Sequence, residues 1–161
     1  MKNKKILFIA STGGHLNELL QLEPLFKKYD SYIVTENTKS NKSLKQKYPK
    51  KVNFLISGSY TSFLSKILYP FKLFINCWIS LYLIIKVNPS VVITTGAHNV
   101  GPMCCLAKLF RKKLIFIETF ANSTAPTKTG KIVYKFADVF IVQWESMLEF
   151  YPNAIYGGWI Y

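Results

Sequence analysis

The chain has 161 residues, half of them hydrophobic, so it is long enough to bury the core of one domain and too apolar to be disordered. Its 21 lysine and arginine residues outnumber 8 aspartate and glutamate residues, which gives a formal net charge of +13. Arg111 is the only arginine, whereas sequence-specific nucleic-acid readers depend on arginine for bidentate base contacts. A lysine-dominated positive field suits phosphates or anionic lipid head groups at least as well as nucleic acid, and charge alone does not choose between them. The lysines form no aromatic-interleaved or helical recognition pattern, so we expect no nucleic-acid partner.

Strand-like and helix-like segments alternate along the chain. In chain order, the predicted elements are a strand at Lys5–Ala10, a helix at Leu16–Lys28, strands at Ser31–Thr35 and Val52–Ile56, a long apolar helix at Ser62–Val87, a strand at Ser90–Thr94, a helix at Val100–Phe110, a strand at Leu114–Ile117, a helix at about Thr129–Phe136 and a strand at Val139–Val142. A break is expected at Pro70, and the lysine-rich stretch 39–51 is expected to be a solvated helix or loop. The alternation predicts an α/β, Rossmann-like, doubly wound and mainly parallel sheet, in a single domain over residues 1–161.

Ligands of such sheets bind beyond the carboxyl ends of the strands. The loops that follow those ends are 11–15, 95–101, 118–129 and 143–145. The first two contain glycines, which let backbone amides approach a phosphate, and the only two histidines, His15 and His98. The alternatives are that the first loop is an ordinary tight turn, that the histidines are structural, and that Glu118 is a hydrogen-bonding or helix-capping carboxylate.

Several chemistries lack their motif in this sequence. Asp30 and Asp138 are the only aspartates, so there is no Asp-x-Asp pair to hold a metal against a nucleotide diphosphate. Residues 129–131, Thr-Gly-Lys, lack the other elements of a Walker phosphate-binding loop. The cysteines have no zinc-site spacing and are expected to be reduced and buried: Cys77, Cys104 and Cys105. We therefore expect neither a metal nor a cofactor.

The longest apolar segment, Leu73–Ile85, contains no charged residue. It reaches the roughly 20 residues of a spanning helix only by including Pro70 and Lys72. Lys72, Asn76 and Ser80 recur every four residues as a narrow polar stripe. The preferred interpretation is a helix that packs partly on the sheet and dips partly into the bilayer interface; a wholly buried helix and a true span are the alternatives. The residues expected to face the membrane are Phe71, Phe74, Trp78 and Tyr82.

A resemblance to known glycosyltransferases lies in the segments Ser11–Leu16, Thr95–His98, Phe116–Ala121, Pro126–Lys131 and Ala137–Glu145. Together these segments resemble bacterial capsule and exopolysaccharide proteins that are similar to the membrane subunit of the eukaryotic two-chain N-acetylglucosaminyltransferase acting on dolichol-linked sugar. The first segment is also similar to the Thr-Gly-Gly-His loop of the peptidoglycan lipid-intermediate glycosyltransferase, a single chain of two Rossmann-like domains (the GT-B fold). The resemblance implies an N-terminal, acceptor-binding and membrane-docking half, with a separate partner chain as the C-terminal half that supplies most of the sugar-nucleotide site.

The implied reaction is inverting, metal-independent transfer of a hexose or uronic acid from a nucleoside diphosphate sugar to an undecaprenyl-diphosphate-linked saccharide. It would take place at the cytoplasmic face of the bacterial cell membrane. We expect His15 to be the catalytic base, because imidazole exchanges protons near neutral pH. The residues expected to bind the acceptor or a phosphate are Ser11, Thr12, Gly13, Gly14, Gly96, His98, Asn99 and Glu118. The alternative is a non-catalytic activator or membrane scaffold that recruits and enhances a partner glycosyltransferase.

One departure concerns membrane anchoring. The eukaryotic subunit carries an N-terminal membrane-spanning helix, for which Met1–Lys5 leaves no room before the first predicted strand. Any anchoring is therefore expected from the apolar helix and from the lysine-rich surface.

Overall fold

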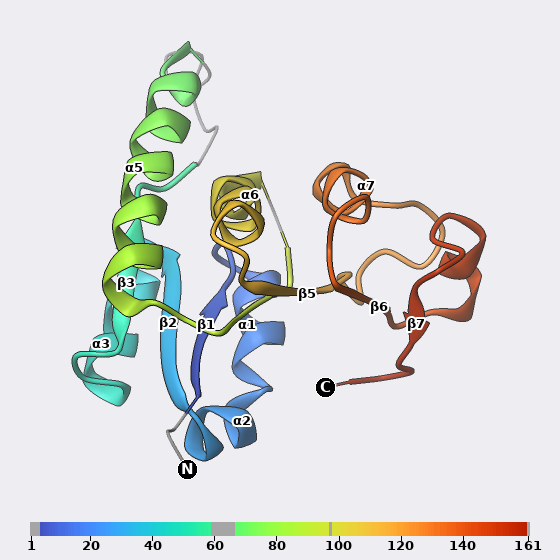
Figure 1. The fold of residues 1–161 in the computed structure, drawn as a ribbon, viewed down its shortest axis with the longest axis horizontal. Helices are drawn as coiled ribbons and strands as arrows, with labels where there is room; N and C mark the ends of the chain where they lie inside the picture. The colour runs from blue at the N-terminus through green and yellow to red at the C-terminus, as the bar shows by residue number, and fades with distance from the viewer. Residues whose placement is uncertain (1–3, 59–66, 97, 161) are drawn as a thin grey trace.

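A computed structural model describes residues 4–58, 67–96 and 98–160 of the chain. In these residues the strands form one sheet of order β3-β2-β1-β4-β5-β6-β7, and every neighbouring pair is parallel (Figure 1). The strands are β1 (Lys5–Ile9), β2 (Asp30–Glu36), β3 (Val52–Leu55), β4 (Val91–Thr94), β5 (Lys113–Ile117), β6 (Val139–Val142) and β7 (Ile155–Tyr156). The chain winds outward from β1 to β3, returns to place β4 beside β1, and winds outward again to β7. This arrangement confirms the predicted doubly wound, parallel α/β fold.

Helices cover both faces of the sheet. They are α1 (Gly14–Leu20), α2 (Glu23–Lys28), α3 (Leu44–Lys47), α5 (Tyr69–Val87), α6 (Gly101–Leu109) and α7 (Lys128–Val133), with short 3₁₀ turns η1 (Ser40–Ser43), η2 (His98–Val100) and η3 (Glu145–Glu149). Alternate residues of β1 show the two layers. Leu7 and Ile9 belong to the buried cluster that includes α5, α6 and α7, while Ile6 and Phe8 pack with α1, α2 and α3. Because both faces are covered, the strands are apolar at nearly every position, as the sequence pattern indicated.

Two prolines explain where the predicted helices begin. The single helix predicted at 16–28 is wrong: it is two helices, because Pro24 lacks the amide hydrogen of a helix interior and lies instead in the first turn of α2. Pro70 likewise lies in the first turn of α5, so the expected break is the start of that helix. Residues 62–66, which were predicted to be helical, lie outside the described residues.

Two expectations about burial also need correction. The lysine-rich stretch 39–51 is not uniformly solvated, because Asn41 and Leu44 are buried. Of the three cysteines only Cys104 is buried, whereas Cys77 and Cys105 are exposed. Adjacent residues of an α-helix point about 100° apart, so Cys104 faces the sheet while Cys105 faces outward.

Candidate functional site

The loop between β1 and α1 presents open backbone at its two glycines. Gly13 has a φ of 74°, a left-handed conformation that favours glycine, and its carbonyl accepts a hydrogen bond from the amide of Asn17 at 3.1 Å. Gly13 and Gly14 are exposed, and a Cβ atom on either would meet no atom within 4 Å. A ligand can therefore approach the backbone of this loop, as its predicted phosphate-binding role requires.

The two side chains that precede these glycines are turned toward the protein. Ser11 is buried, its hydroxyl donates to the Thr12 carbonyl at 3.4 Å, and its own carbonyl accepts from Thr35 Oγ1 at 3.0 Å. Thr12 is half-buried, and its Oγ1 accepts from Asn41 Nδ2 at 3.4 Å. The side chain of Ser11 thus serves the fold of the loop, and its contact with a ligand stays a prediction.

His15 joins the first glycine loop to the loop after β4. Its Nδ1 lies 2.8 Å from the carbonyl oxygen of Thr95, and Thr95 Oγ1 donates to the His15 carbonyl at 2.6 Å. A carbonyl only accepts, so this contact places a proton on Nδ1 and leaves Nε2 of a neutral ring as the proton acceptor. Gly96 has a φ of 97°, and a Cβ there would lie 3.3 Å from the Phe116 ring and 3.8 Å from the His15 ring. The structure therefore brings His15 and Gly96 together, as predicted.

The rest of the second glycine loop is only partly open. The backbone of His98 begins η2, and its side chain lies outside the described residues. Asn99 is 3% exposed, and its Nδ2 donates to Glu36 Oε1 at 2.8 Å. Glu36 is also buried, and its Oε2 accepts from Ser57 Oγ at 2.9 Å and from the Gly58 amide at 3.3 Å. Asn99 thus belongs to a buried network, in which its Oδ1 has no hydrogen-bond partner among the described residues, and its contact with the acceptor stays a prediction.

Glu118 holds together the loop between β5 and α7. It is 2% exposed and accepts hydrogen bonds from Thr127 Oγ1 at 3.0 Å and from the Tyr151 hydroxyl at 2.8 Å. Thr127 Oγ1 also accepts from the amide of Gly130 at 2.9 Å and so caps α7. Burial, with a further contribution from Glu118, raises the pKa of Tyr151 above its usual range. These contacts favour the alternative interpretation of Glu118, a hydrogen-bonding carboxylate that supports the cap of α7, and its contact with the acceptor stays a prediction.

Glu18 lies at the edge of the sheet where the carboxyl ends of the strands meet, which is called the rim below. It was not among the residues predicted from the sequence. It lies one turn after His15 on α1, and its Oε1 accepts from Thr119 Oγ1 at 2.8 Å and from the Phe120 amide at 3.0 Å. Its Oε2 is buried and has no hydrogen-bond partner among the described residues. Burial raises the pKa of Glu18. The available signal was the spacing of three residues from His15, which places both side chains on one side of a helix that starts at the rim.

Aromatic rings cover the rim beside Glu18. The Phe120 ring lies 4.7 Å from that of Trp144 and 5.2 Å from that of Trp159. Trp144 Nε1 donates to the Phe120 carbonyl at 2.8 Å, and Trp159 is 74% exposed. Trp144, which follows β6, thus packs partly against the loop 118–129.

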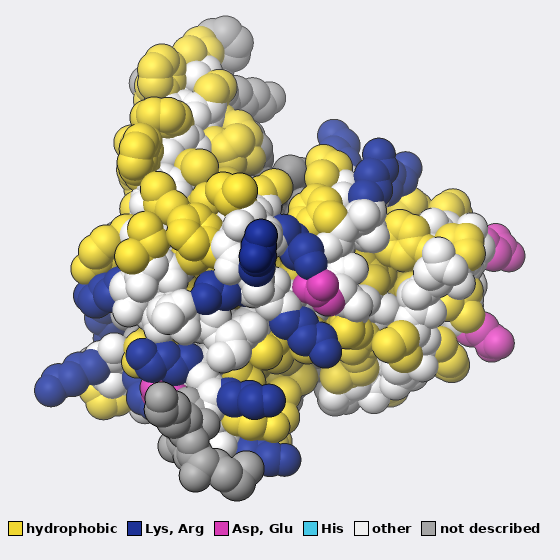
Figure 2. Space-filling view, viewed as in Figure 1, with side chains coloured by type: hydrophobic (Ala, Val, Ile, Leu, Met, Phe, Trp, Pro, Cys, Tyr) yellow, Lys and Arg dark blue, Asp and Glu magenta, His cyan; other side chains and the backbone are white. Residues whose placement is uncertain are grey.

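The polar stripe of α5 faces the protein, and its apolar face is exposed. Asn76 and Ser80 are fully buried, and the Asn76 amide pairs with the backbone N and O of Ile56 at 2.8 and 2.9 Å. The residues predicted to face a membrane are 56–67% exposed: Phe71, Phe74, Trp78 and Tyr82. Figure 1 shows α5 extending past the carboxyl ends of the neighbouring strands, and Figure 2 shows hydrophobic side chains along it and across α6 toward α7. The structure thus shows α5 packed on the sheet along one side only, and the membrane contact of its other side stays a prediction.

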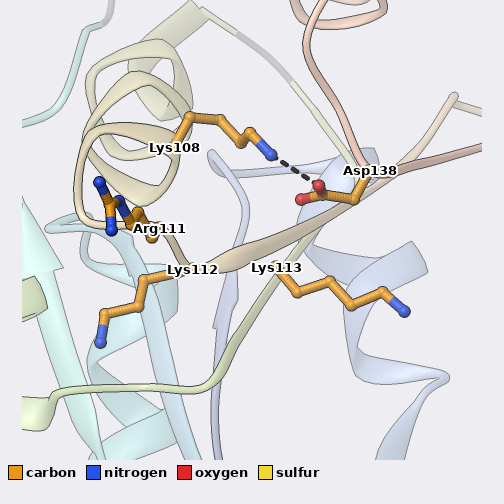
Figure 3. Close-up of a pocket in the computed structure, with 5 residues that line it drawn as sticks. All are labelled: Lys108, Arg111, Lys112, Lys113 and Asp138. Atoms are coloured by element: carbon orange, nitrogen blue, oxygen red, sulfur yellow. Dashed lines mark hydrogen bonds and ion pairs between the residues drawn. The ribbon is translucent and has the colours of Figure 1, made fainter.

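Among the described residues, α5 is also the one helix that is long and apolar enough to cross a membrane. Just over a quarter of its most apolar 18-residue stretch is buried in the protein. Cationic side chains border the same apolar face in Figure 2. One such group surrounds a hollow of about 400 Å³ between the end of α6 and the start of β5 (Figure 3). The hollow is lined by Lys108, Arg111, Lys112, Lys113 and Asp138. Only Lys108 of the four cations pairs with Asp138, at 2.6 Å, so the group keeps a net positive charge.

Comparison with protein families gives one match over nearly the whole chain. The family described as "Oligosaccharide biosynthesis protein Alg14 like" matches residues 6–160. The UDP-N-acetylglucosamine transferase subunit ALG14 of Mus musculus is 29% identical over 177 residues, covering 96% of this chain and 82% of the relative. The Homo sapiens subunit is 27% identical over 175 residues, covering 95% of this chain and 81% of the relative. These relatives are eukaryotic, and they give no support to the predicted role in bacterial capsule synthesis.

Solved structures show the same fold at low sequence identity. MurG of Acinetobacter baumannii superposes with a TM-score of 0.69 and 16% identity, and the UDP-N-acetylglucosamine 2-epimerase of Rickettsia bellii with 0.68 and 16%. The match covers 89% and 93% of this chain but only 42% and 41% of those proteins. The chain thus corresponds in fold to less than half of each.

Proposed function

The chain belongs to the family of Alg14-like oligosaccharide biosynthesis proteins, and we propose on this premise that it is the acceptor-side, membrane-docking subunit of a two-chain inverting glycosyltransferase. Two observations support the proposal. The named relatives are UDP-N-acetylglucosamine transferase subunits, and the fold matches less than half of each larger solved protein. A second chain would then act as the C-terminal half and supply most of the donor site.

The rim around His15 carries the chemical part of the proposal. In inverting transfer the acceptor oxygen attacks the anomeric carbon, the bond to the nucleoside diphosphate breaks, and the acceptor hydroxyl loses its proton. With Nδ1 held by the Thr95 carbonyl, Nε2 of His15 is oriented to take that proton. The exposed amides of Gly13 and Gly14 would contact a phosphate of the acceptor or donor. The reaction is proposed to need no metal, with lysines and the partner chain neutralising the leaving diphosphate.

The acceptor and its location form the finer part of the proposal. The acceptor is a polyprenyl-diphosphate-linked saccharide at the cytoplasmic face of a membrane, reached through the exposed face of α5. The capsule-like motifs of the sequence favour an undecaprenyl carrier in a bacterial cell membrane, whereas the eukaryotic relatives favour N-acetylglucosamine as the sugar. Assays that pair undecaprenyl- and dolichyl-linked acceptors with several nucleoside diphosphate sugars separate these possibilities.

The test of the proposed function compares the purified chain alone with the chain co-purified with its partner. We expect transfer to a lipid-linked acceptor only from the complex. Turnover by the isolated chain would contradict the division into two subunits, and an inactive but well-assembled complex, assayed with all donors and acceptors, would contradict the transferase assignment.

A second candidate, a non-catalytic scaffold that enhances a partner, is favoured by the burial of Asn99 and Glu118. Asn99 Nδ2 and the Glu118 carboxylate are occupied within the chain, so fewer polar groups than predicted are available to a substrate. The two candidates differ at His15, because a scaffold keeps its effect on the partner when this imidazole is removed.

A further inference from the structure

A groove of about 840 Å³ runs between α5 and α6 on the exposed apolar face (Figure 2). Its volume lies in the range of ligand pockets, roughly 300–1,000 Å³. The lining from α5 is Pro70, Leu73, Phe74 and Cys77, and the lining from α6 and α7 is Gly101, Pro102, Cys105, Leu106, Leu109 and Ile132. No charged side chain of the part of the chain that the structure describes lines it. The groove is therefore suited to a hydrocarbon ligand.

One end of the groove reaches the catalytic rim. Gly101 and Pro102 begin α6 directly after the rim loop that contains Gly96, and Leu109 ends α6 at the other side. At the rim end the groove adjoins a second hollow of about 270 Å³, which shares Gly101, Cys105 and Ile132 with it. A ligand lying along the groove would thus have one end beside the proposed site of transfer.

Among residues 4–58, 67–96 and 98–160, the only charged residue that lines either hollow is a cation. Lys128 is exposed at the start of α7 and lines the smaller hollow, and no acidic side chain of these residues lines either one. A ligand that complements the pair has a long apolar chain and an anionic head. A protein helix would complement the apolar groove, but nothing in it would require the single lysine at the rim end.

From this geometry we propose that the α5–α6 groove binds the hydrocarbon chain of a polyprenyl phosphate, with its phosphate end beside Lys128. The choice of lipid class rests on the proposed function, and the inference deepens it by assigning the acceptor's lipid to particular residues. The groove then holds a single lipid chain along α6, and the outer face of α5, with Trp78 and Tyr82, contacts the bilayer around it.

The natural cysteines provide the readout. Cys77 and Cys105 line the groove from opposite helices and are exposed, while Cys104 is buried and serves as an internal reference. The full chain is bound to phosphatidylcholine vesicles that contain either phosphatidylglycerol or undecaprenyl phosphate at equal total charge. The rate at which a water-soluble maleimide modifies each thiol is then measured by mass spectrometry. We expect undecaprenyl phosphate to slow modification of Cys77 and Cys105 in a saturable manner.

Two matched pairs of variants test the position of the lipid. A Cβ at Gly101 meets no atom within 4 Å, so Gly101→Trp fills the groove from open space, and Gly101→Ala is its control. We expect the lipid to lose its protective effect in Gly101→Trp and to keep it in Gly101→Ala. Lys128→Gln should raise the half-saturating lipid concentration about five-fold, since one lysine near an anionic head strengthens binding by about that factor. Lys135→Gln removes the same charge from the same helix region outside both hollows and should leave it unchanged.

Three results would overturn the proposal. Equal protection by phosphatidylglycerol vesicles would show that the face is merely immersed in the bilayer. Protection that appears only when the partner chain is added would assign the groove to that protein. Undiminished protection in folded Gly101→Trp would place the lipid elsewhere. The readout is binding, so protection by the lipid without sugar transfer in the complex would contradict only the proposed function, and transfer without protection would contradict only the groove.

Discussion

The carboxyl rim of the sheet and the outward face of α5 differ in how their side chains are partnered. At the rim, His15 is bound by Thr95 and Glu18 by Thr119 and Phe120, so side chains from different loops hold one another in place. On α5, the exposed side chains are large and apolar, and Asn76 contacts the backbone from the inner side of the helix. Hydrogen bonds fix groups in position, whereas exposed apolar area favours whatever removes it from water.

This difference separates two kinds of substitution. A change at the rim removes a positioned group and alters chemistry or stability. A change on the outer face of α5 removes little packing within the chain, such as the edge contact between the Phe74 and Trp78 rings, and mainly alters where the protein resides. Each of the following predictions either sharpens this contrast or breaks it.

The largest effect is expected from His15→Ala. If Nε2 takes the acceptor proton, its loss lowers kcat of the assembled complex by roughly 10²–10⁴-fold. Asn17→Ala, an exposed position on the same helix, is the matched control and should keep wild-type kcat. The kcat values are measured by steady-state kinetics on complexes with verified stoichiometry. A wild-type kcat for His15→Ala would contradict the catalytic role and support the scaffold function.

The next largest effect concerns membrane binding by the double variant Phe74→Ser with Trp78→Ser. These side chains are 64% and 60% exposed, so the variant should fold, yet it should lose at least about ten-fold in partition to anionic vesicles at high salt. High salt is chosen because it screens the lysines and isolates the apolar contribution. Vesicle sedimentation measures the loss of membrane binding, and circular dichroism checks that the variant is folded.

The control for this variant is Leu83→Ser, on the inner side of the same helix. Leu83 is 2% exposed, so a buried hydroxyl and a cavity should destabilise the fold by about 2–5 kcal/mol. Collapse of the Phe74 and Trp78 variant would mean that this face packs against protein, and wild-type vesicle binding by a folded variant would place the membrane contact elsewhere.

A smaller effect is expected from Gly130→Ala at the rim. A Cβ there would collide with Glu118 Oε2 and the Tyr151 hydroxyl, so the substitution should lower the free energy of unfolding by about 1–3 kcal/mol. Gly101→Ala is also in a helix but meets open space, and it should raise stability by up to about 1 kcal/mol. Urea denaturation of the two variants measures the difference. Equal effects would show that the Glu118 network is looser than its hydrogen bonds indicate.

The sequence predicted the sheet because a doubly wound fold leaves a strong local signal. Strands covered on both faces become continuous apolar runs, and each run was found within a residue or two of its position. The prolines also marked helix starts, although Pro24 was not used for that purpose. These features depend on the local chain, so they can be read without knowing the tertiary contacts.

The orientation of polar side chains could not be predicted in the same way. The period of α5 revealed the stripe of Asn76 and Ser80, but the direction of the stripe depends on Ile56, whose backbone satisfies the buried amide. Glu118 was correctly placed after β5, and its inward orientation depends on Thr127 and Tyr151, which are distant in sequence. Whether a rim residue is structural or faces a ligand is decided by such non-local partners.

The smallest expected effect is on the pH dependence of stability in Glu18→Gln. It tests whether every buried polar atom at the rim has a hydrogen-bond partner. Because burial raises the folded-state pKa of Glu18 above its ordinary value of 4.5, the protonated form favours folding. This contribution is fully present below pH 4.5 and is lost as the pH rises through the folded-state pKa. Glutamine keeps an Oε1 acceptor for Thr119 and Phe120 and stays uncharged at all pH values. The free energy of unfolding of the variant, relative to the wild type, should therefore rise between pH 4 and pH 7.

Besides burial, two neighbouring side chains contribute to the pKa of Glu18, since His15 lowers it and Glu118 raises it. The measurement is therefore repeated in a His15→Gln background, where loss of the lowering contribution from His15 should enlarge the change with pH. Parallel unfolding curves for Glu18→Gln and wild type from pH 4 to pH 7 would contradict the prediction. They would mean that water or a neighbouring group satisfies the buried Oε2, and that the rim is as completely partnered as its other hydrogen bonds suggest. A rising difference would instead identify Glu18 as a carboxylate held beside His15 at a cost to stability, which is typical of groups retained for function.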